Sequence, residues 1–455
     1  MTRGNFIAIG YSSLGAIAAL LQRAIALDFS AYHVICNRPN ELDETVRALV
    51  DEGEVNAHTA DVCREHELIG VCQGIAFNPS TDVLICLQDR PTLAYLKTLE
   101  YFYSNSTHAI PIPCEGIRNS RLKAQTRLKL DLGDVPNTRW ALCKPNTVHE
   151  TIRALSHSES PYFYIKPIAG MGSELVRRVS ANDLENSLTT AFSQTKKHFV
   201  EADYPFTLGG KIYSANADLL IEEEIYGPEY TVDGYILDGE VIAIAQHKET
   251  RKTSPFIGDG LIISPPHDGK KLGERIPDET GYELSHASTA NERELIEYCE
   301  KVLKCLDIDN WVFHMEVIDQ LDRSTGESLG PRLVEINPRV PGGLLARSFL
   351  LRKGVNLVDA ALNLYLDLPI DRKEDPCVTG QFPIYWEKSG IQDLRGLPKK
   401  LAIEGLEHLH ICEKLEHYPE GQENYLAFAM IKCSSHDEVR LAARKTFEAI
   451  KQSCA

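Results

Sequence analysis

Two neighbouring stretches of β-branched and aromatic residues constrain the fold of this chain more than any other feature. In residues 312–318 and 331–337, apolar and polar side chains alternate, which is the pattern of a strand with one covered face. The link between them is rich in Asp, Ser, Gly and Pro, so we expect a hairpin rather than a helix. Pairing of the two strands would place Glu316, Glu335 and Asn337 on one face of a sheet.

These three side chains point to a metal site. Two carboxylates and an amide oxygen that converge within a few ångströms repel one another unless a cation lies between them, and hard oxygen ligands suit Mg²⁺. Arg339 precedes the turn Pro341-Gly342-Gly343, where its planar guanidinium could hold an anionic intermediate. By itself, the same pattern also fits a strand that simply enters a turn, so the interpretation depends on the rest of the chain.

The length and charge of the chain narrow the class of protein. Its 455 residues are enough for about three domains of ordinary size. Acidic residues outnumber basic ones and give a net charge of −17, which argues against non-specific binding to nucleic acid or to an anionic membrane. The N-terminal apolar run is interrupted at residues 10–13 and followed by Arg23, so it indicates a strand, a turn and a helix rather than a membrane span or a signal peptide.

The cysteines indicate a reducing compartment. The chain has 12 of them, scattered singly, with no Cys-x-x-Cys pair and no Cys/His cluster at metal-ligand spacing. Free thiols in apolar surroundings behave as small hydrophobic side chains. The sequence therefore predicts a cytoplasmic protein without a zinc site.

The first 112 residues have the pattern of an α/β layer. Strand-like runs at 5–10 and 83–87 flank a helical run at 16–27, which favours a parallel sheet. The turn at residues 11–15 lacks the Gly-x-Gly-x-x-Gly spacing of a dinucleotide site. An anion could still bind at the start of the helix, but an ordinary strand-to-helix turn explains the segment better.

The central part of the chain combines lysines with a loop of small residues. Residues 118–132 predict a basic amphipathic helix, whose charged face is ordinarily solvated but could also direct one lysine into a phosphate site. Residues 163–167 predict a strand that contains Lys166, and residues 168–173 form a small-residue loop whose backbone N–H groups could bind phosphate oxygens. Because the lysine precedes the glycines, this is not a Walker A loop.

An acidic segment and a basic segment follow. Residues 219–233 contain three adjacent glutamates and a Gly-Pro turn between two apolar runs. Such a segment ordinarily faces solvent, but it can also be a hinge whose backbone hydrogen-bonds a planar heterocycle while Glu229 accepts from a ribose hydroxyl. Residues 248–266 combine basic residues with Gly, Pro and Ser, which is typical of a mobile lid and equally of an exposed basic loop.

The rest of the chain carries fewer chemical signals. Residues 290–306 and 356–366 predict two helices. After residue 371 the pattern indicates a linker, short strands including 425–431, and a closing helix at 435–452. No side chains of this tail form a group with evident chemistry, so we expect it to serve packing or dimerisation.

Taken in order, these segments resemble the ATP-grasp ligases that join a carboxylate to an amine. The resemblance covers roughly residues 119–366 and implies a fold that combines α/β and α+β elements. It implies an N-terminal Rossmann-like domain at residues 1–112, an ATP-grasp domain at 113–370 with its lid at about 248–266, and a small C-terminal α+β domain at 371–455. Biotin carboxylase and bacterial L-amino acid ligases share this arrangement.

The resemblance assigns nucleotide contacts to matching positions. Lys123 lies thirteen residues before Pro136, as the first phosphate-binding lysine of the family does before its Val-Pro, with Arg121 and Lys129 as rivals. The other contacts would come from a second lysine and its glycine-rich loop, from the hinge, where Glu223 C=O and Ile225 N–H would hold adenine, and from a ribose-binding glutamate. These residues are Lys166, Gly170, Met171, Gly172, Ser173, Glu222, Glu223, Ile225 and Glu229.

The resemblance also assigns the reacting end of the site. Glu316, Glu335 and Asn337 would be the magnesium ligands, and Arg339 would stabilise an acyl phosphate. Besides Lys166, a lid lysine would act in catalysis and the Pro-Gly-Gly turn would line the substrate site, through Lys248, Gly342 and Gly343. Two departures limit the comparison: the first-domain turn is not glycine-rich, and a long hairpin separates the two metal-binding strands, so substrate identity is not transferable from any one relative.

The implied function is that of an ATP-dependent, ADP-forming ligase. A substrate carboxylate, or an equivalent oxygen nucleophile, would attack the γ-phosphate of ATP to give an acyl phosphate, and an amine, expected to be an amino acid, would displace phosphate to form a C–N bond. The cofactors would be ATP and Mg²⁺, with Mn²⁺ as a substitute. The partners would be a small-molecule carboxylate and amine, with no nucleic acid and no membrane, and a homodimer is the base-rate expectation.

Four alternatives stay open. The enzyme could form dipeptides, could be a natural-product ligase that couples an amino acid to a non-peptide acceptor, or could activate bicarbonate as purine-pathway and biotin-carboxylase-like enzymes do. It could also be a non-catalytic ATP-binding regulatory protein with the same fold. The full set of Glu316, Glu335, Asn337 and Arg339 argues against the last alternative, because loss of turnover usually leaves such a set incomplete.

Overall fold

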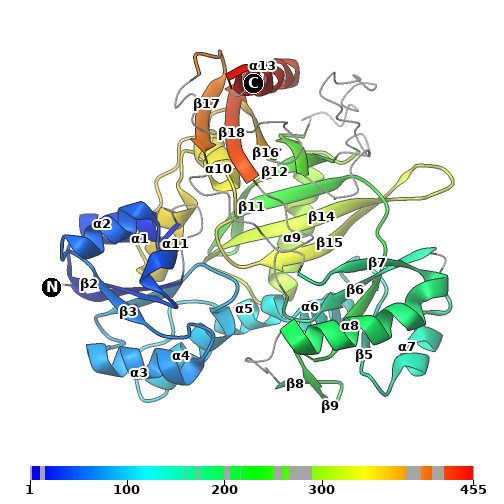
Figure 1. Cartoon of the computed structure of the whole chain (residues 1–455), viewed down its shortest axis with the longest axis horizontal. Coiled ribbons are helices and arrows are strands. Elements are labelled where there is room, and N and C mark those ends of the chain that lie inside the picture. Colours follow the sequence, from blue (N-terminus) through cyan, green and yellow to red (C-terminus); the bar gives the residue numbers. More distant parts are fainter. Residues whose placement is uncertain are drawn as a thin grey trace.

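The architecture comes from a computed structural model, which Figure 1 shows as a whole. It describes residues 3–10, 16–158, 160–170, 174–198, 205–215, 217–250, 259–265, 289–385, 401–411 and 425–453. The predicted loop residues Met171, Gly172 and Ser173 lie outside these ranges, as do residues 251–258 and 266 of the predicted lid. Among the described helices, none is both long and apolar enough to cross a membrane.

The N-terminal segment folds into a parallel sheet between helices, as its hydrophobic pattern predicts. Its four strands have the order β3-β2-β1-β4, and every described neighbour pair is parallel. Residues 6–9 of β1 and all of β4 are buried because helices cover both faces of the sheet. The strands are β1 (Arg3–Ile9), β2 (Phe29–Cys36), β3 (Asn56–Thr59) and β4 (Val83–Cys86), and the helices are α1 (Ala16–Ala26), α2 (Glu44–Asp51), α3 (Glu65–Ile75) and α4 (Thr92–Tyr103).

Two short helices connect this segment to the rest of the chain. They are α5 (Cys114–Arg121) and α6 (Lys123–Leu132). The single helix predicted for residues 118–132 is therefore wrong: Leu122 has an extended backbone, and the N–H of Lys123 donates to the carbonyl of Ile168 at 3.1 Å. Of the two alternatives for the basic residues, solvated or directed inward, the second holds for Lys123 and Arg127 of α6, which are buried.

A second, antiparallel sheet has the strand order β5-β10-β6-β7. Its inner face packs on α7 and α8 around a separate apolar core. A two-stranded ribbon extends from it. The elements are β5 (Trp140–Cys143), α7 (Val148–Leu155), β6 (Tyr162–Pro167), β7 (Arg177–Ser180), α8 (Leu184–His198), β8 (Pro205–Leu208), β9 (Lys211–Ser214) and β10 (Leu219–Glu223).

The largest sheet has eight strands in the order β15-β14-β11-β12-β13-β16-β18-β17. The predicted domain boundary at residue 370 falls before β16, yet the sheet continues across it, because Ile262 of β13 pairs with Gln381 of β16. The tail thus extends the sheet that carries the acidic strands. The strands are β11 (Glu229–Leu237), β12 (Glu240–Thr250), β13 (Asp259–Ile263), β14 (Trp311–Leu321), β15 (Ser328–Asn337), β16 (Val378–Tyr385), β17 (Leu406–Ile411) and β18 (Tyr425–Cys433).

Helices cover the large sheet and join it to the first domain. The described members are α9 (Glu292–Cys305), α10 (Leu345–Lys353), α11 (Leu357–Tyr365) and α13 (His436–Ser453). One continuous apolar core runs from β1 and α1 through α11 to β11 and β14. This core fixes the end of β4 relative to the end of β15, which is where the candidate site lies.

Candidate functional site

The predicted hairpin is confirmed, and it brings the acidic residues together. Strands β14 and β15 are antiparallel, with Glu316 directly opposite Glu335 and His314 opposite Asn337. Residues directly opposite on antiparallel strands point to the same face. The register therefore places the three predicted metal ligands, Glu316, Glu335 and Asn337, side by side on one face of the large sheet.

One extra residue in β15 adjusts this register. Glu335 pairs with Glu316 whereas Leu333 pairs with Val317, so Val334 forms a bulge. The guanidinium of Arg127 donates to the carbonyls of Leu333 at 2.7 Å and of Val334 at 3.1 Å. Arg127 thereby supplies the hydrogen bonds that the bulge removes from the ladder.

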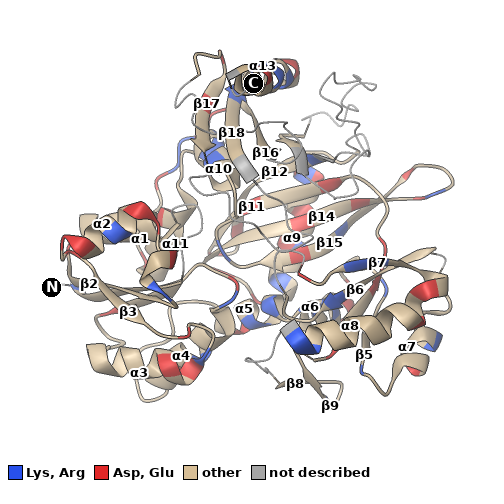
Figure 2. Cartoon of the chain, viewed as in Figure 1, with Lys and Arg blue, Asp and Glu red and all other residues tan. Residues whose placement is uncertain are grey.

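A lysine neutralises each of the two carboxylates. Lys248 lies with its Nζ 3.2 Å from Oε1 of Glu316 and 2.8 Å from Oε1 of Glu229, which is its partner across β11 and β12. Lys123 lies with its Nζ 3.0 Å from Oε1 of Glu335. The Lys248 charge is the main reason why the pKa of Glu316 falls far below its usual value. Figure 2 shows basic residues of α6 beside the acidic residues of β14 and β15 in the middle of the molecule.

A buried imidazole supports Glu316 from behind. Nδ1 of His314 lies 2.6 Å from Oδ1 of the fully buried Asp233, and its Nε2 lies 3.8 Å from Oε1 of Glu316. Burial alone would lower the pKa of His314, but the carboxylate of Asp233 outweighs it and raises that pKa to about 9. The sequence analysis did not identify either residue; the alternation of β14, which puts His314 on the same face as Glu316, was the available signal.

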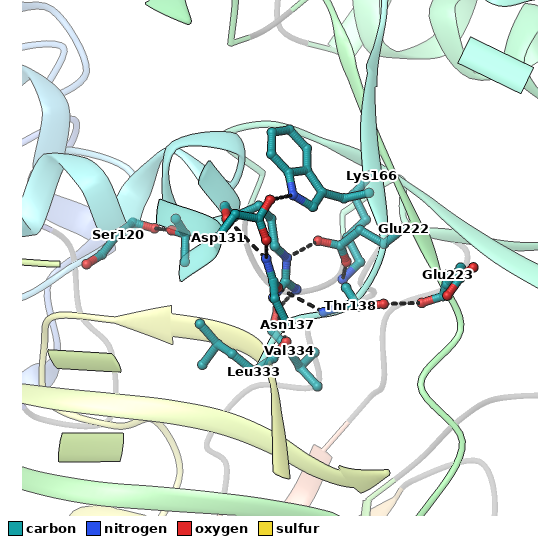
Figure 3. A network of polar contacts seen from close by, with 12 residues as sticks. Ser120, Asp131, Asn137, Thr138, Lys166, Glu222, Glu223, Leu333 and Val334 are labelled. Atoms are coloured by element: carbon teal, nitrogen blue, oxygen red, sulfur yellow. Dashed lines mark hydrogen bonds and ion pairs between the residues drawn. The ribbon is translucent and has the colours of Figure 1, made fainter. Parts of the chain in front are cut away.

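The second predicted lysine lies in a buried ionic network. Nζ of Lys166 is 2.6 Å from Oε2 of Glu222, and Nε of Arg127 is 2.6 Å from Oε1 of the same carboxylate. Burial alone would raise the pKa of Glu222, but the charges of Arg127 and Lys166 hold it at about 2. Figure 3 shows Glu222 and Lys166 pointing toward one another, with the bulge residues Leu333 and Val334 on the other side of the network. Both side-chain oxygens of Glu222 are thus engaged within the protein.

The three candidates for the first phosphate-binding side chain lie in different surroundings. Lys123 is buried, and its Nζ donates to the carbonyl of Gly170 at 2.7 Å, at the start of the small-residue loop. Arg121 donates to the same carbonyl at 3.0 Å. Lys129 instead lies at the surface beside Asp307. Burial, together with the charges of Arg121 and Lys166, lowers the pKa of Lys123 despite the nearby carboxylate of Glu335.

The predicted hinge follows β10 directly. The carbonyl of Glu223 accepts a hydrogen bond from Oγ1 of Thr138 at 3.2 Å, and the N–H of Ile225 has no partner among the described residues. The side chain of Glu224 is held between Arg178, at 2.5 Å, and Arg323 of the β14–β15 hairpin. The N–H of Ile225 could therefore donate a hydrogen bond to a ligand. The carbonyl of Glu223 would have to accept from the ligand and from Thr138 at the same time.

Close packing of the Gly-Pro turn against β14 requires a glycine at position 227. Gly227 has a φ of +156°, and a Cβ there would overlap the carbonyl oxygen of Asp319 on β14. Only a residue without a side chain allows the predicted hinge to approach β14 this closely. The turn thus fixes Glu229 at the start of β11, opposite Lys248.

The first domain contributes a carboxylate to the end of β15. Arg339 lies with a terminal nitrogen 2.6 Å from Oδ2 of Asp89, just beyond β4, and both side chains are largely shielded from solvent. Burial alone would raise the pKa of Asp89, but Arg339, Arg121 and Lys123 lower it. The same carboxylate raises the pKa of Arg339 against the effect of burial. The sequence analysis missed Asp89, because only the folded chain brings it to Arg339.

A cavity of about 440 Å³ begins at this ion pair. Asp89, Arg339, Gly342 and Gly343 line it, together with residues of α1, α10 and β17. The two glycines predicted to contact substrate therefore border a partly open cavity next to Arg339. Lys248, on the far side of Glu316, does not line it.

The chemistry of these residues fits a hard divalent cation only in part. The described residues contain no group of three or more His, Cys, Asp or Glu side chains placed to hold a metal ion. The predicted ligands are two carboxylates and one amide, a set that suits Mg²⁺ when phosphate oxygens complete the coordination shell. A metal here would thus bind together with a nucleotide rather than in a cage of protein ligands.

The chain matches known proteins in structure but not in sequence searches. No protein-family model matches the chain, and no curated protein matches it in sequence. The L-amino acid ligase from Bacillus licheniformis is 16% identical, with 99% of this chain and 98% of that chain covered and a TM-score of 0.62. The N5-carboxyaminoimidazole synthase from Aspergillus clavatus, in complex with ADP and 5-aminoimidazole ribonucleotide, is 16% identical, with 99% of each chain covered and a TM-score of 0.64.

A third structure extends the comparison. The biotin carboxylase domain dimer of 2-oxoglutarate carboxylase from Hydrogenobacter thermophilus, in complex with MgADP, ADP and bicarbonate, is 12% identical, with 97% of this chain and 89% of that chain covered and a TM-score of 0.66. At such identities the likeness concerns the fold alone. Because each match spans almost the whole chain, including the N-terminal and C-terminal segments, the chain has the ATP-grasp fold of the carboxylate-amine ligases.

Proposed function

We propose that the protein is an ATP-dependent, ADP-forming ligase that activates a carboxylate as an acyl phosphate and joins it to an amine. The observation that carries the proposal is the alignment of Glu316, Glu335 and Asn337 on one face of the β14–β15 hairpin, with Arg339 at its end. The whole-chain likeness to ligases whose structures hold ADP or MgADP supports the choice of nucleotide. A cytoplasmic location and a homodimer stay predictions.

The basic residues would hold the phosphates of ATP. Lys123 and Lys166 are buried side chains that now bind Glu335 and Glu222, at 3.0 and 2.6 Å. Because phosphate oxygens carry more charge than a carboxylate, an entering nucleotide would compete for these ammonium groups. The backbone of Glu223 and Ile225 would hold adenine. Glu229 would accept a hydrogen bond from a ribose hydroxyl, for which its carboxylate would have to share or release Lys248.

The metal ligands would act together with the nucleotide. Glu316, Glu335 and Asn337 would hold Mg²⁺, which, when bound, neutralises charge on the phosphates during phosphoryl transfer. Lys123 would be displaced from Glu335 toward the phosphates as this carboxylate turns to the cation. His314, held by Asp233 at 2.6 Å, would keep Glu316 oriented.

Neither of the two chemical steps needs a nucleophilic side chain of the protein. An oxygen of the substrate carboxylate forms a bond to the γ-phosphorus, the bond from that phosphorus to the bridging oxygen breaks, and ADP leaves. The amine nitrogen then bonds to the acyl carbon, the carbon–oxygen bond to phosphate breaks, and phosphate and a proton leave. Arg339, oriented by Asp89 at 2.6 Å, would stabilise the negative charge of the acyl phosphate.

Analysis of the nucleotide products tests the proposal. Purified protein is incubated with ATP, Mg²⁺ and a pool of carboxylates, amino acids and other amines, and ADP, AMP and phosphate are separated. We expect ADP and phosphate to appear only when the pool is present, and successive halving of the pool then identifies both substrates. A natural-product ligase would give the same nucleotides with a non-peptide acceptor.

Two outcomes would contradict the proposal. AMP with pyrophosphate would exclude an acyl phosphate. Tight binding of ATP without turnover in any pool would favour a regulatory ATP-binding protein with this fold.

A further inference from the structure

The cavity beside Arg339 reaches beyond the residues that the proposed chemistry uses. Its far part lies past the Gly342-Gly343 turn, against the first turn of α10 and against β17 of the C-terminal segment. In Figure 1, α10 lies next to β17 and β18. The tail therefore does more than extend the sheet: it supplies one wall of a partly open cavity that begins at the candidate active site.

The side chain of Arg347 is the first sign of a ligand in this space. Arg347 lies in the first turn of α10, lines the cavity and is partly buried. Its Nε is buried without a hydrogen-bond partner, and none of the described residues accepts from its guanidinium or forms an ion pair with it. A buried guanidinium nitrogen without an acceptor costs free energy, so such a group normally has an anionic partner.

Two histidines of β17 face the same space. His408 and His410 alternate with Leu409 and Ile411, which pack into the apolar core below α13. The rings of His408 and His410 lie 6.5 Å apart at an angle of 21°, and both line the cavity. Burial, and after it the charge of Arg347, lower the pKa of His408, so its imidazole is neutral at pH 7.

Pairing of the tail strands fixes this orientation independently. His408 pairs with Met430 and His410 with Phe428 of β18. Met430 accepts a hydrogen bond from Ser348 of α10 at 3.6 Å, so this face of the two strands looks toward α10. The register of β17 and β18 thus fixes the face on which both histidines lie.

The charges of the cavity wall are unbalanced. Of the described residues that line it, Asp89 is the one acidic side chain, and it is already paired with Arg339. Arg347 adds a second positive charge to this wall, and its Nε has no hydrogen-bond partner. The remaining wall is largely apolar, which leaves the positive charge poorly shielded by solvent.

We propose that Arg347, with His408 and His410, binds an anionic group, a carboxylate or a phosphate, of one substrate. This substrate therefore carries a negative charge in addition to the group that reacts near Arg339. A planar guanidinium and two imidazoles can together donate several hydrogen bonds to such a group. The identification of the ligand as a substrate rests on the proposed ligase function, whereas the anion site itself does not.

Direct binding measurements without nucleotide test the site. Calorimetric titrations of the full chain use three matched pairs of probes: succinate and succinamide, L-glutamate and L-glutamine, and glycerol 3-phosphate and glycerol. We expect at least one anionic probe to bind about tenfold more tightly than its neutral partner, as charge-assisted hydrogen bonds allow. The first two pairs report a carboxylate ligand and the third a phosphate ligand.

Variants connect this preference to the proposed residues. Arg347→Ala should abolish the preference for the anion, Arg347→Lys should retain part of it, and His408→Gln should weaken it. Arg372→Ala removes an equal charge from the surface, where Arg372 pairs with Glu240 at 3.3 Å, and should change nothing. Thermal unfolding of each variant shows whether the fold is intact, and His408→Gln keeps the test available if the Arg347 variants do not fold.

Two results would overturn the anion site: equal binding of anionic and neutral probes throughout the panel, or an undiminished preference in Arg347→Ala. Because no ATP is present, either result leaves the ligase proposal untouched. Conversely, if no ADP forms in the product analysis, the ligand of this site is no longer identified as a substrate, but the anion site itself stands.

Discussion

The guanidinium of Arg127 and the carboxylate of Glu222 form an ion pair of 2.6 Å at a place where both side chains are almost completely buried. Arg127 comes from α6, Glu222 from β10 of the second sheet, and the remaining donors of Arg127 reach Asn137 and the β15 bulge. One side chain thus joins the lysine-bearing sheet to the strand that carries Glu335. The relative position of Lys166 and Glu335 depends on this contact.

Replacement of Arg127 by Met should therefore destabilise the protein strongly. The variant leaves Glu222 with Lys166 alone and leaves the carbonyls of Leu333 and Val334 without donors. Breaking a buried ion pair by removal of one partner costs about 3–5 kcal/mol. Urea unfolding followed by circular dichroism measures the loss, and Arg153→Met on the exposed face of α7 is the control. A loss in the Arg127 variant no larger than that of the control would contradict the role of this network.

The same network predicts a pH dependence of stability. The pKa of Glu222 is about 2 in the folded protein, below its ordinary value of 4.5. A carboxylate with a depressed pKa contributes stability that is fully present above its unfolded-state pKa and is lost as the pH falls toward the folded-state pKa. The contribution is on the order of 3 kcal/mol.

The measurement compares urea unfolding of the wild type and Glu222→Gln between pH 7 and the lowest pH at which both fold. The difference in unfolding free energy between them should be constant above about pH 4.5 and should shrink as the pH falls below it. A difference that stays constant through the acidic range would mean that folding does not lower the pKa of Glu222.

The hairpin with its acidic face could be predicted because local sequence determines it. Alternating side chains and a turn-rich link define β14 and β15, and strand alternation then places Glu316 and Glu335 on one face. The helix α9 was predictable for the same reason, since its apolar residues recur at helical spacing and Asn291 caps it. These elements need no information from the rest of the chain.

Other features depend on contacts between distant segments. The break at Leu122 arises because the N–H of Lys123 bonds to the carbonyl of Ile168, so a pattern that reads as one helix folds as two. The helix α10 was missed because two of its four buried positions, Ser348 and Arg352, are polar and obscure the apolar stripe. Contacts such as Asp89 with Arg339 depend on how the domains pack, which a single sequence does not reveal.

Glu335→Gln should abolish most of the ligase activity while the protein stays folded. The amide keeps the shape of the side chain but removes the charge that would bind Mg²⁺ and that now pairs with Lys123 at 3.0 Å. Loss of an ionised ligand should reduce turnover by roughly a hundredfold. The assay is ADP formation with the substrates found in the product analysis, at several Mg²⁺ concentrations.

The matched control for this variant is Glu327→Gln, an exposed carboxylate in the turn region of the same hairpin. It should retain wild-type turnover, because its side chain lies away from the acidic face. Near-normal turnover in Glu335→Gln, with thermal unfolding like that of the control, would remove Glu335 from the metal site.

The contact between the first domain and the end of β15 gives the last prediction. Asp89 holds Arg339 at 2.6 Å, so Asp89→Asn should leave the guanidinium charged but poorly oriented toward the acyl phosphate. We expect kcat to fall about tenfold while the KM for ATP changes little, because Asp89 acts through Arg339 and not through the nucleotide site. Arg339→Lys should reduce kcat further, since a lysine cannot reproduce the planar donor pair. The surface variant Asp51→Asn in the same domain controls for the loss of one negative charge. A wild-type kcat in Asp89→Asn, or a change confined to the KM for ATP, would mean that the first domain does not position Arg339 for the reaction.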